Sequence, residues 1–274
     1  MRKFLAILLA LIFVLSTVLL VACDDKPGNG GDAETSDTEG DGTSETTGST
    51  GGNGGGQKDP NGPGVEVQSV GGKNAATLFN DAIAAVKSAT VYEFVASIQS
   101  TGYSSTISVK KSRNTVYGTE TTLRGDTTSY QEMWGLSDWC YWNCKYADEP
   151  TEYEKKTSAS AYEMVMNSLT KYKDSLVMIA ESDLVKGKIP TAKLYQNGDI
   201  YYIDIAFTAA EGGSMTNNQA GNFKFTFNAN GALTSLVCTA VDGTTATYAI
   251  SNIGNVAEIS APANVHLYVD TTDE

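Results

Sequence analysis

The stretch LYQNGDIYYIDIAF, residues 194–207, decides the fold. Two runs rich in aromatic and β-branched residues flank Asn197-Gly198, a dipeptide typical of two-residue β-hairpin turns. The pattern predicts strands over Leu194–Gln196 and Asp199–Phe207. A strand of this composition with a tight turn beside it pairs with its sequence neighbour, so the local topology is antiparallel.

The same pattern continues to the end of the domain. Phe223, Phe225 and Phe227 alternate with Lys224 and Thr226, and the next turns and strands are expected at Asn230-Gly231, Leu233–Ala240, Asp242-Gly243 and Thr245–Ile250. Successive hairpins leave no room for the crossover helices of a parallel sheet. We therefore expect an antiparallel meander, with the polar segment Glu211–Gly221 as an exposed loop between strands.

Upstream of the meander, the sequence predicts two helices and further strands. The first helix follows the N-cap Asn74 and covers 75–87, and the second covers 160–173 with Ser160 and Glu163 at capping-box spacing. Between them we expect strands near 92–99, Thr106–Lys110 and Thr115–Leu123, with a turn at Arg124-Gly125-Asp126. The predicted class is α+β, with two short helices packed on one face of an antiparallel sheet and one domain over 65–274.

The most aromatic stretch contains Trp134, Trp139, Tyr141 and Trp142. A strand from about Asp138 to Tyr146 would place Trp142 and Tyr146 on one face and Trp139 and Tyr141 on the other. These four residues, Trp139, Tyr141, Trp142 and Tyr146, are the candidate ligand contacts. Two interpretations stay open: the rings stabilise the sheet by cross-strand packing, or one face lines a pocket or stacks on sugar rings.

The N-terminus has the profile of an export signal. Arg2 and Lys3 precede an apolar run from Phe4 to Ala22, which ends in Leu20-Val21-Ala22-Cys23. That ending resembles the lipobox of bacterial lipoproteins. The resemblance implies that residues 1–22 are cleaved and that the Cys23 thiol is acylated, which anchors the chain on the outer face of the cell membrane. The alternative is an uncleaved membrane helix with the same orientation, because the 19-residue run can cross about 30 Å of hydrocarbon.

Residues 23–64 follow as the acylated cysteine and a linker. Residues 24–64 contain 13 glycines and nine acidic residues, a composition that cannot repay the entropy of folding and predicts disorder. Loss of Arg2 and Lys3 would change the formal net charge from −13 to −15. Such a chain repels nucleic acid and anionic headgroups, so the membrane is an anchor and nucleic acid is excluded as a partner.

Little in the sequence indicates catalysis or metal binding. The chain has one histidine, His266, no Gly-x-Ser-x-Gly motif and no EF-hand loop, although a pair of carboxylates set up by the fold stays an alternative. We predict a non-enzymatic protein without metal or cofactor. On one strand, Cys140 and Cys144 would lie ~13 Å apart, so we expect no disulfide between them, and a bridge from either to Cys238 stays open.

The order of lipobox, linker, helix, meander and mid-chain helix is similar to that of half-barrel lipoproteins of the LolA, LppX and LprG type. The nearest matches are the helix-to-strand segment Ala84–Ile98 and the closing stretch Ile253–Pro262. The resemblance implies a curved half-barrel sheet with a cavity for acyl chains. We therefore predict an apolar or lipid-like ligand between the concave face and the helices at 75–87 and 160–173.

The alternative is a protein- or glycan-interaction module displayed at the cell surface. In that case Phe223, Phe225, Phe227 and helix side chains fill the space beneath the helices. A filled core under the helices favours the interaction module, whereas an open apolar groove favours the carrier.

Overall fold

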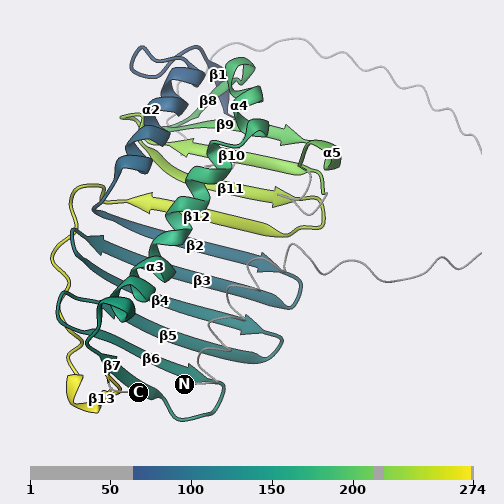
Figure 1. Cartoon of the computed structure of the whole chain (residues 1–274). Helices are drawn as coiled ribbons and strands as arrows, with labels where there is room; N and C mark the ends of the chain where they lie inside the picture. The colour runs from purple at the N-terminus through teal and green to yellow at the C-terminus, as the bar shows by residue number, and fades with distance from the viewer. Residues whose placement is uncertain (1–63, 213–218, 273–274) are drawn as a thin grey trace, which may run out of the picture. The chain divides into compact units, whose positions relative to one another are not determined.

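The computed structural model describes residues 64–212 and 219–272, and it confirms the predicted α+β class. A single curved and unclosed sheet dominates the domain (Figure 1). Its strands are β1 (Val65–Val67), β2 (Tyr92–Ser100), β3 (Tyr103–Ser112), β4 (Thr115–Arg124), β5 (Thr127–Gly135), β6 (Cys140–Tyr146), β7 (Glu152–Lys156), β8 (Leu194–Asn197), β9 (Ile200–Phe207), β10 (Gly221–Phe227), β11 (Leu233–Ala240), β12 (Thr245–Ser251) and β13 (Val269–Asp270).

Two meanders join to make this sheet. The strand order is β1-β8-β9-β10-β11-β12-β2-β3-β4-β5-β6-β7-β13, so β12 pairs with β2 and connects the C-terminal meander to the N-terminal one. Neighbouring strands are antiparallel except β13, which runs parallel to β7. The predicted hairpins are thus present, and the joint between β12 and β2 adds a long-range pairing that no local pattern indicates.

The first hairpin turn lies one residue later than predicted. Asn197 pairs with Ile200, so the two loop residues are Gly198 and Asp199. Gly198 has a φ of 62°, and a glycine with positive φ at the first loop position is typical of a type II′ turn. The loop at Gly125-Asp126 has the same form, since Arg124 pairs with Thr127 and Gly125 has a φ of 57°.

Two longer helices lie on one side of the sheet. The helix α2 (Ala75–Ser88) begins as predicted, because the Asn74 side chain accepts a hydrogen bond from Thr77 N at 2.9 Å. The second helix, α3 (Ala159–Ala180), is longer than the predicted 160–173. Its N-cap is Ser158 and not Ser160, since Ser158 Oγ accepts from Ala161 N at 3.0 Å. Leu176, Val177 and Ala180 are buried in the added turns.

Both predicted helices are present on one face of the sheet, and the difference lies in the length of α3. Besides the 22-residue α3, the described residues form α4 (Asp183–Lys188), α5 (Ala209–Gly212) and the 3-10 helices η1 (Ile189–Thr191) and η3 (Val265–Leu267). Of the expected loop Glu211–Gly221, residues 213–218 lie outside the described part of the chain. None of the helices among the described residues has the length and apolar character needed to cross a bilayer.

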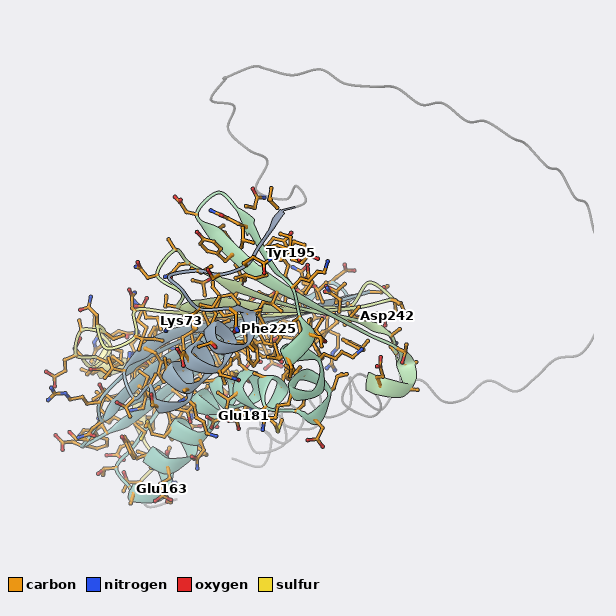
Figure 2. All side chains as sticks on the ribbon, turned by 90° about the horizontal axis from the view of Figure 1, so that it is seen from above. Lys73, Glu163, Glu181, Tyr195, Phe225 and Asp242 are labelled. Carbon is orange, nitrogen blue, oxygen red and sulfur yellow. The ribbon has the colours of Figure 1, made fainter. Side chains whose placement is uncertain are left out.

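The helix α3 runs diagonally across the sheet (Figure 1), and Figure 2 shows the helices together on one side of it. We call this side the helix-covered face. One row of residues that pair directly across neighbouring strands lies on this face. The row consists of Phe94, Val109, Gly118, Met133, Trp142 and Glu154. The helix approaches closely at Gly118, where a Cβ atom would lie 2.5 Å from Leu169 Cδ2. A glycine at this position lets α3 contact the sheet directly.

The opposite side is the open face. The same pairings place on it a row that consists of Glu93, Lys110, Tyr117, Trp134, Tyr141 and Lys155. After β12 the chain runs along the strand ends to β13, next to β7 (Figure 1). On the way, Gly254 N donates to Val91 O, and Tyr268 is buried among aromatic rings of the open face. The C-terminal segment therefore covers one corner of the face opposite to α2 and α3.

Candidate functional site

The four predicted contact residues divide between the two faces of the sheet. Trp142 lies on the helix-covered face and its Nε1 donates to Glu154 Oε2 at 3.0 Å. Tyr146 is on the same face at the end of β6 and is 49% exposed. Tyr141 lies on the open face, where its ring centroid is 6.4 Å from that of Trp139. The predicted strand parity is confirmed for Tyr141, Trp142 and Tyr146, whereas Trp139 precedes β6 and lies in the β5–β6 turn. Only Trp139 and Tyr141 belong to one cluster.

That cluster is an aromatic patch on the open face, at β4 to β7. Ring centroids lie 4.9 Å apart for Tyr117 and Trp134, 5.3 Å for Tyr141 and Tyr268, and 5.2 Å for Tyr153 and Tyr268. Most of these ring pairs meet edge to face, the arrangement that aromatic quadrupoles favour. The open-face patch consists of Tyr117, Trp134, Trp139, Tyr141, Tyr153 and Tyr268.

Polar groups are built into the patch. Glu132 accepts hydrogen bonds from Tyr117 Oη at 2.8 Å and from Asn143 Nδ2 at 2.9 Å, and Asn143 Nδ2 also donates to Tyr268 Oη at 3.1 Å. Burial and then the hydrogen bond to Glu132 raise the pKa of Tyr130 to about 12. The tyrosine hydroxyls around Glu132 therefore stay protonated at neutral pH and act as donors.

The patch has a buried centre and an accessible rim. Trp134, Tyr141 and Tyr268 are at most 8% exposed, whereas Tyr117, Trp139 and Tyr153 are only partly buried. Tyr130 lies beside the patch and is 37% exposed. The Lys155 ammonium lies 4.9 Å from the Trp139 ring centroid. Partly exposed rings combined with the Glu132 carboxylate and the Lys155 ammonium are suited to a ligand that has both apolar and hydroxyl surfaces.

A cavity of about 300 Å³ adjoins the patch at the strand ends. It is lined by the β5–β6 turn at 136–139, by Cys140 and Lys156, and by the start of α3 with Tyr162. A second cavity of about 170 Å³ lies near β1, α2 and η1. Neither of these two cavities lies between the centre of the sheet and the helices.

The space beneath the helices is filled by side chains. Phe225 and Phe227 are fully buried and Phe223 is 2% exposed. The Phe225 ring meets the Phe79 ring of α2 edge to face, with centroids 4.9 Å apart, and Figure 2 shows Phe225 on the side of the sheet that carries α2. Further along, Leu169 of α3 fills the space over Gly118. This packing favours the interaction module among the two alternatives left by the sequence.

A buried polar network also lies on the helix-covered face. Glu120 is 5% exposed and accepts from Gln131 Nε2 at 2.7 Å, and Ser105 Oγ and Thr122 Oγ1 lie 3.4 Å from its other oxygen. Burial raises the pKa of Glu120, while these donors and Lys171 of α3 act in the opposite direction. The network supplies the buried Glu120 carboxyl with hydrogen-bond donors from β3, β4 and β5, on the face that α3 covers.

The three described cysteines are free thiols. Cys140 and Cys144 lie on β6 as predicted, and burial raises the pKa of Cys140 to about 11. Cys238 lies on β11, six strand spacings from β6, or about 29 Å at ~4.8 Å per spacing. The bridge from either β6 thiol to Cys238, left open by the sequence, is therefore too long for a disulfide. His266 is exposed on η3, and Cys23 lies outside the described residues.

Most residues of the open-face patch were not predicted from the sequence as ligand contacts. Tyr117, Trp134 and Tyr141 form one cross-strand row, which the lengths of the β4–β5 and β5–β6 hairpins could have indicated. Tyr153 becomes visible only once β7 is recognised as a strand. Tyr268 has no local signal, because it reaches the patch through the long C-terminal segment.

Comparisons with known proteins leave the family open. No protein-family model matches the chain, and no curated protein matches its sequence. Among solved structures, the chain is similar to MucB in its complex with MucA(peri), at 10% identity and a TM-score of 0.24. The match covers 72% of this chain and 60% of that chain. A TM-score of this size carries no argument about function.

Proposed function

We propose that the chain is a lipid-anchored, non-enzymatic binding module, displayed on the outer face of the cell membrane, that binds a protein or glycan partner through the open-face patch. The observation that supports this most is the difference between the faces. Aromatic rims and polar groups are accessible on the open face, whereas phenylalanines and leucines fill the helix-covered face.

The anchor part of the proposal is supported by Leu20-Val21-Ala22-Cys23 and by the acidic linker at 24–64. Wild-type protein should fractionate with membranes and carry an acyl group on Cys23. Cys23→Ser should release the protein or leave the precursor uncleaved, which immunoblotting and mass spectrometry of the N-terminus would detect. Normal processing and membrane retention of Cys23→Ser would contradict the proposed anchor.

The binding part can be tested with the chain carrying Cys23→Ser and recovered from the soluble fraction, which has no acyl anchor to carry it into the pellet, and with isolated envelopes of the cells that make it. Tyr130→Ala combined with Tyr153→Ala removes two accessible rings of the open face, and Tyr146→Ala removes an exposed ring on the other face as the matched control. We expect the double variant to cosediment less and the control to behave as wild type. Protease treatment of the envelopes should abolish binding to a protein partner, and periodate, which cleaves vicinal diols, should abolish binding to a glycan.

Binding of an apolar ligand stays a prediction. It needs space beneath α2 and α3, where Phe79 and Phe225 are in contact. Native mass spectrometry of the full chain after gentle purification would reveal a co-purified lipid. A retained lipid with a saturable site would favour the carrier over the module.

A further inference from the structure

We infer that the cavity at the end of the β5–β6 hairpin is a subsite for one neutral sugar ring of a glycan. The inference rests on the proposed function, because it assigns the partner of the open-face patch to a chemical class. Trp139 connects the cavity to the open-face patch, because it lines the cavity and its ring centroid lies 6.4 Å from that of the patch residue Tyr141. The rest of the cavity opens at the strand ends on the side of α3, where Cys140, Lys156 and Tyr162 line it.

The size of the cavity fits a single ring. Its volume of about 300 Å³ is at the lower end of the ~300–1,000 Å³ that is usual for small-molecule sites. A cavity of this size holds one compact ring and leaves the rest of an oligosaccharide outside. A bound glycan could then continue from Trp139 onto the open face.

The lining offers the two kinds of surface that a sugar ring needs. Trp139 and Tyr162 contribute aromatic rings against which the C–H face of a sugar can pack. The hydroxyl of Tyr162 already donates to Asn114 O at 2.6 Å, so its ring is held in place. Sugar hydroxyls would meet polar groups from Ser137, Asp138 and Lys156.

Asp138 and Lys156 are available to a ligand. Among the described residues, neither side chain makes a hydrogen bond or an ion pair with another residue, although both line the cavity. A carboxylate accepts hydrogen bonds from hydroxyls and an ammonium donates to hydroxyl or ring oxygens. The negative acceptor and the positive donor together carry no net charge, so they suit a neutral, hydroxyl-rich ligand.

Charge argues against an anionic ligand. The formal net charge of the chain is −13, and Asp138 is part of the cavity wall itself. The N-terminus of α3 is already capped, because Ser158 Oγ accepts from Ala161 N at 3.0 Å. A polyanionic glycan would be repelled by the domain, whereas a neutral one pays no such cost.

The experiment titrates the purified full chain, as the Cys23→Ser protein where solubility requires it, with cellotetraose, chitotetraose and mannotetraose by calorimetry. Tetragalacturonic acid is the anionic comparator. We expect saturable binding of at least one neutral probe with a Kd of about 0.1–1 mM, in line with a small contact area, and no binding of the anionic one. Trp139→Ala should weaken binding at least about tenfold, as for other aromatic anchors, whereas Trp139→Tyr keeps a ring and should stay within about threefold.

Asp138→Asn removes the charged acceptor without changing the shape of the side chain and should weaken binding several-fold. Tyr146→Ala, on the other face, should bind as wild type. The inference is overturned if no neutral probe binds, or if Trp139→Ala binds as tightly as wild type. In either case, loss of envelope binding in the Tyr130→Ala, Tyr153→Ala variant would leave the proposed function standing. Unchanged envelope binding in that variant would contradict the proposed function, whereas the sugar subsite is decided by the neutral probes and Trp139→Ala.

Discussion

The two faces of one sheet differ in what covers them, and this difference separates stability from recognition. On the helix-covered face, α2 and α3 bury phenylalanines, and Gly118 lets Leu169 reach the sheet. On the open face, the sheet carries threonines, charges and an aromatic patch against which the C-terminal segment packs. Substitutions on the first face should therefore change unfolding, and those on the second should change local order and binding.

Phe225→Ala should have the largest effect on stability. Phe225 is fully buried and contacts the Phe79 ring, so truncation removes a large apolar group and leaves a cavity. Truncations of this kind cost about 3–5 kcal/mol. Urea unfolding followed by circular dichroism would measure the loss, with Tyr146→Ala as the control that removes an exposed ring. An effect of Phe225→Ala below that of the control would mean that α2 does not form the core.

Tyr268→Ala should act mainly on the C-terminal segment, because Tyr268 is its buried anchor on the open face. The ring contacts Trp134, Tyr141 and Tyr153, whereas β13 adds only two residue pairs with β7. We expect a loss of about 1–2 kcal/mol, because these contacts join a segment to a sheet that is already folded.

Limited proteolysis followed by mass spectrometry should show faster cleavage within 252–272 in Tyr268→Ala. Val269→Ala is the neighbouring control, since Val269 is 63% exposed. If both variants resist cleavage as wild type does, the segment is held by contacts other than Tyr268.

Only part of this contrast could be predicted from the sequence. Features set by neighbouring residues were predictable, whereas features set by contacts between distant segments were not. Local patterns were sufficient for the existence of the hairpin at 194–207, although its turn lies one residue later, and for the Asn74 cap and the parity of β6. They could not show which face of β6 the helices cover, because that depends on where α3 crosses the sheet. The choice of Ser158 over Ser160 as the N-cap also depends on the packing of the first turn of α3.

The candidate site was less predictable than the fold. Trp139 and Tyr141 were identified by their own composition and spacing. Tyr268 joins them from 127 positions beyond Tyr141 in the chain, through a parallel pairing of β13 with β7 that no turn signal announces. Long-range contacts of this kind are decided by the summed packing of the sheet, to which each local segment contributes little.

Glu120→Gln should have the smallest effect, and its sign should depend on pH. Burial raises the pKa of Glu120 in the folded protein, so folding favours the protonated carboxyl. The stability from this group is complete below the ordinary glutamate pKa of 4.5 and is lost as the pH rises through the raised folded pKa. Glutamine has the same shape and stays neutral, and Gln131 can present its amide oxygen to the new donor.

Glu120→Gln should therefore be more stable than wild type at pH 7, by less than about 1 kcal/mol, and should lose this advantage near pH 4. Urea unfolding at both pH values measures the difference. Glu152→Gln is the control, because Glu152 lies in the same cross-strand row but is exposed. A Glu120→Gln variant that is less stable at pH 7 than at pH 4, relative to wild type, would show that Glu120 is a stabilising carboxylate. In that case Lys171 and the hydrogen-bond donors outweigh the cost of burying its charge.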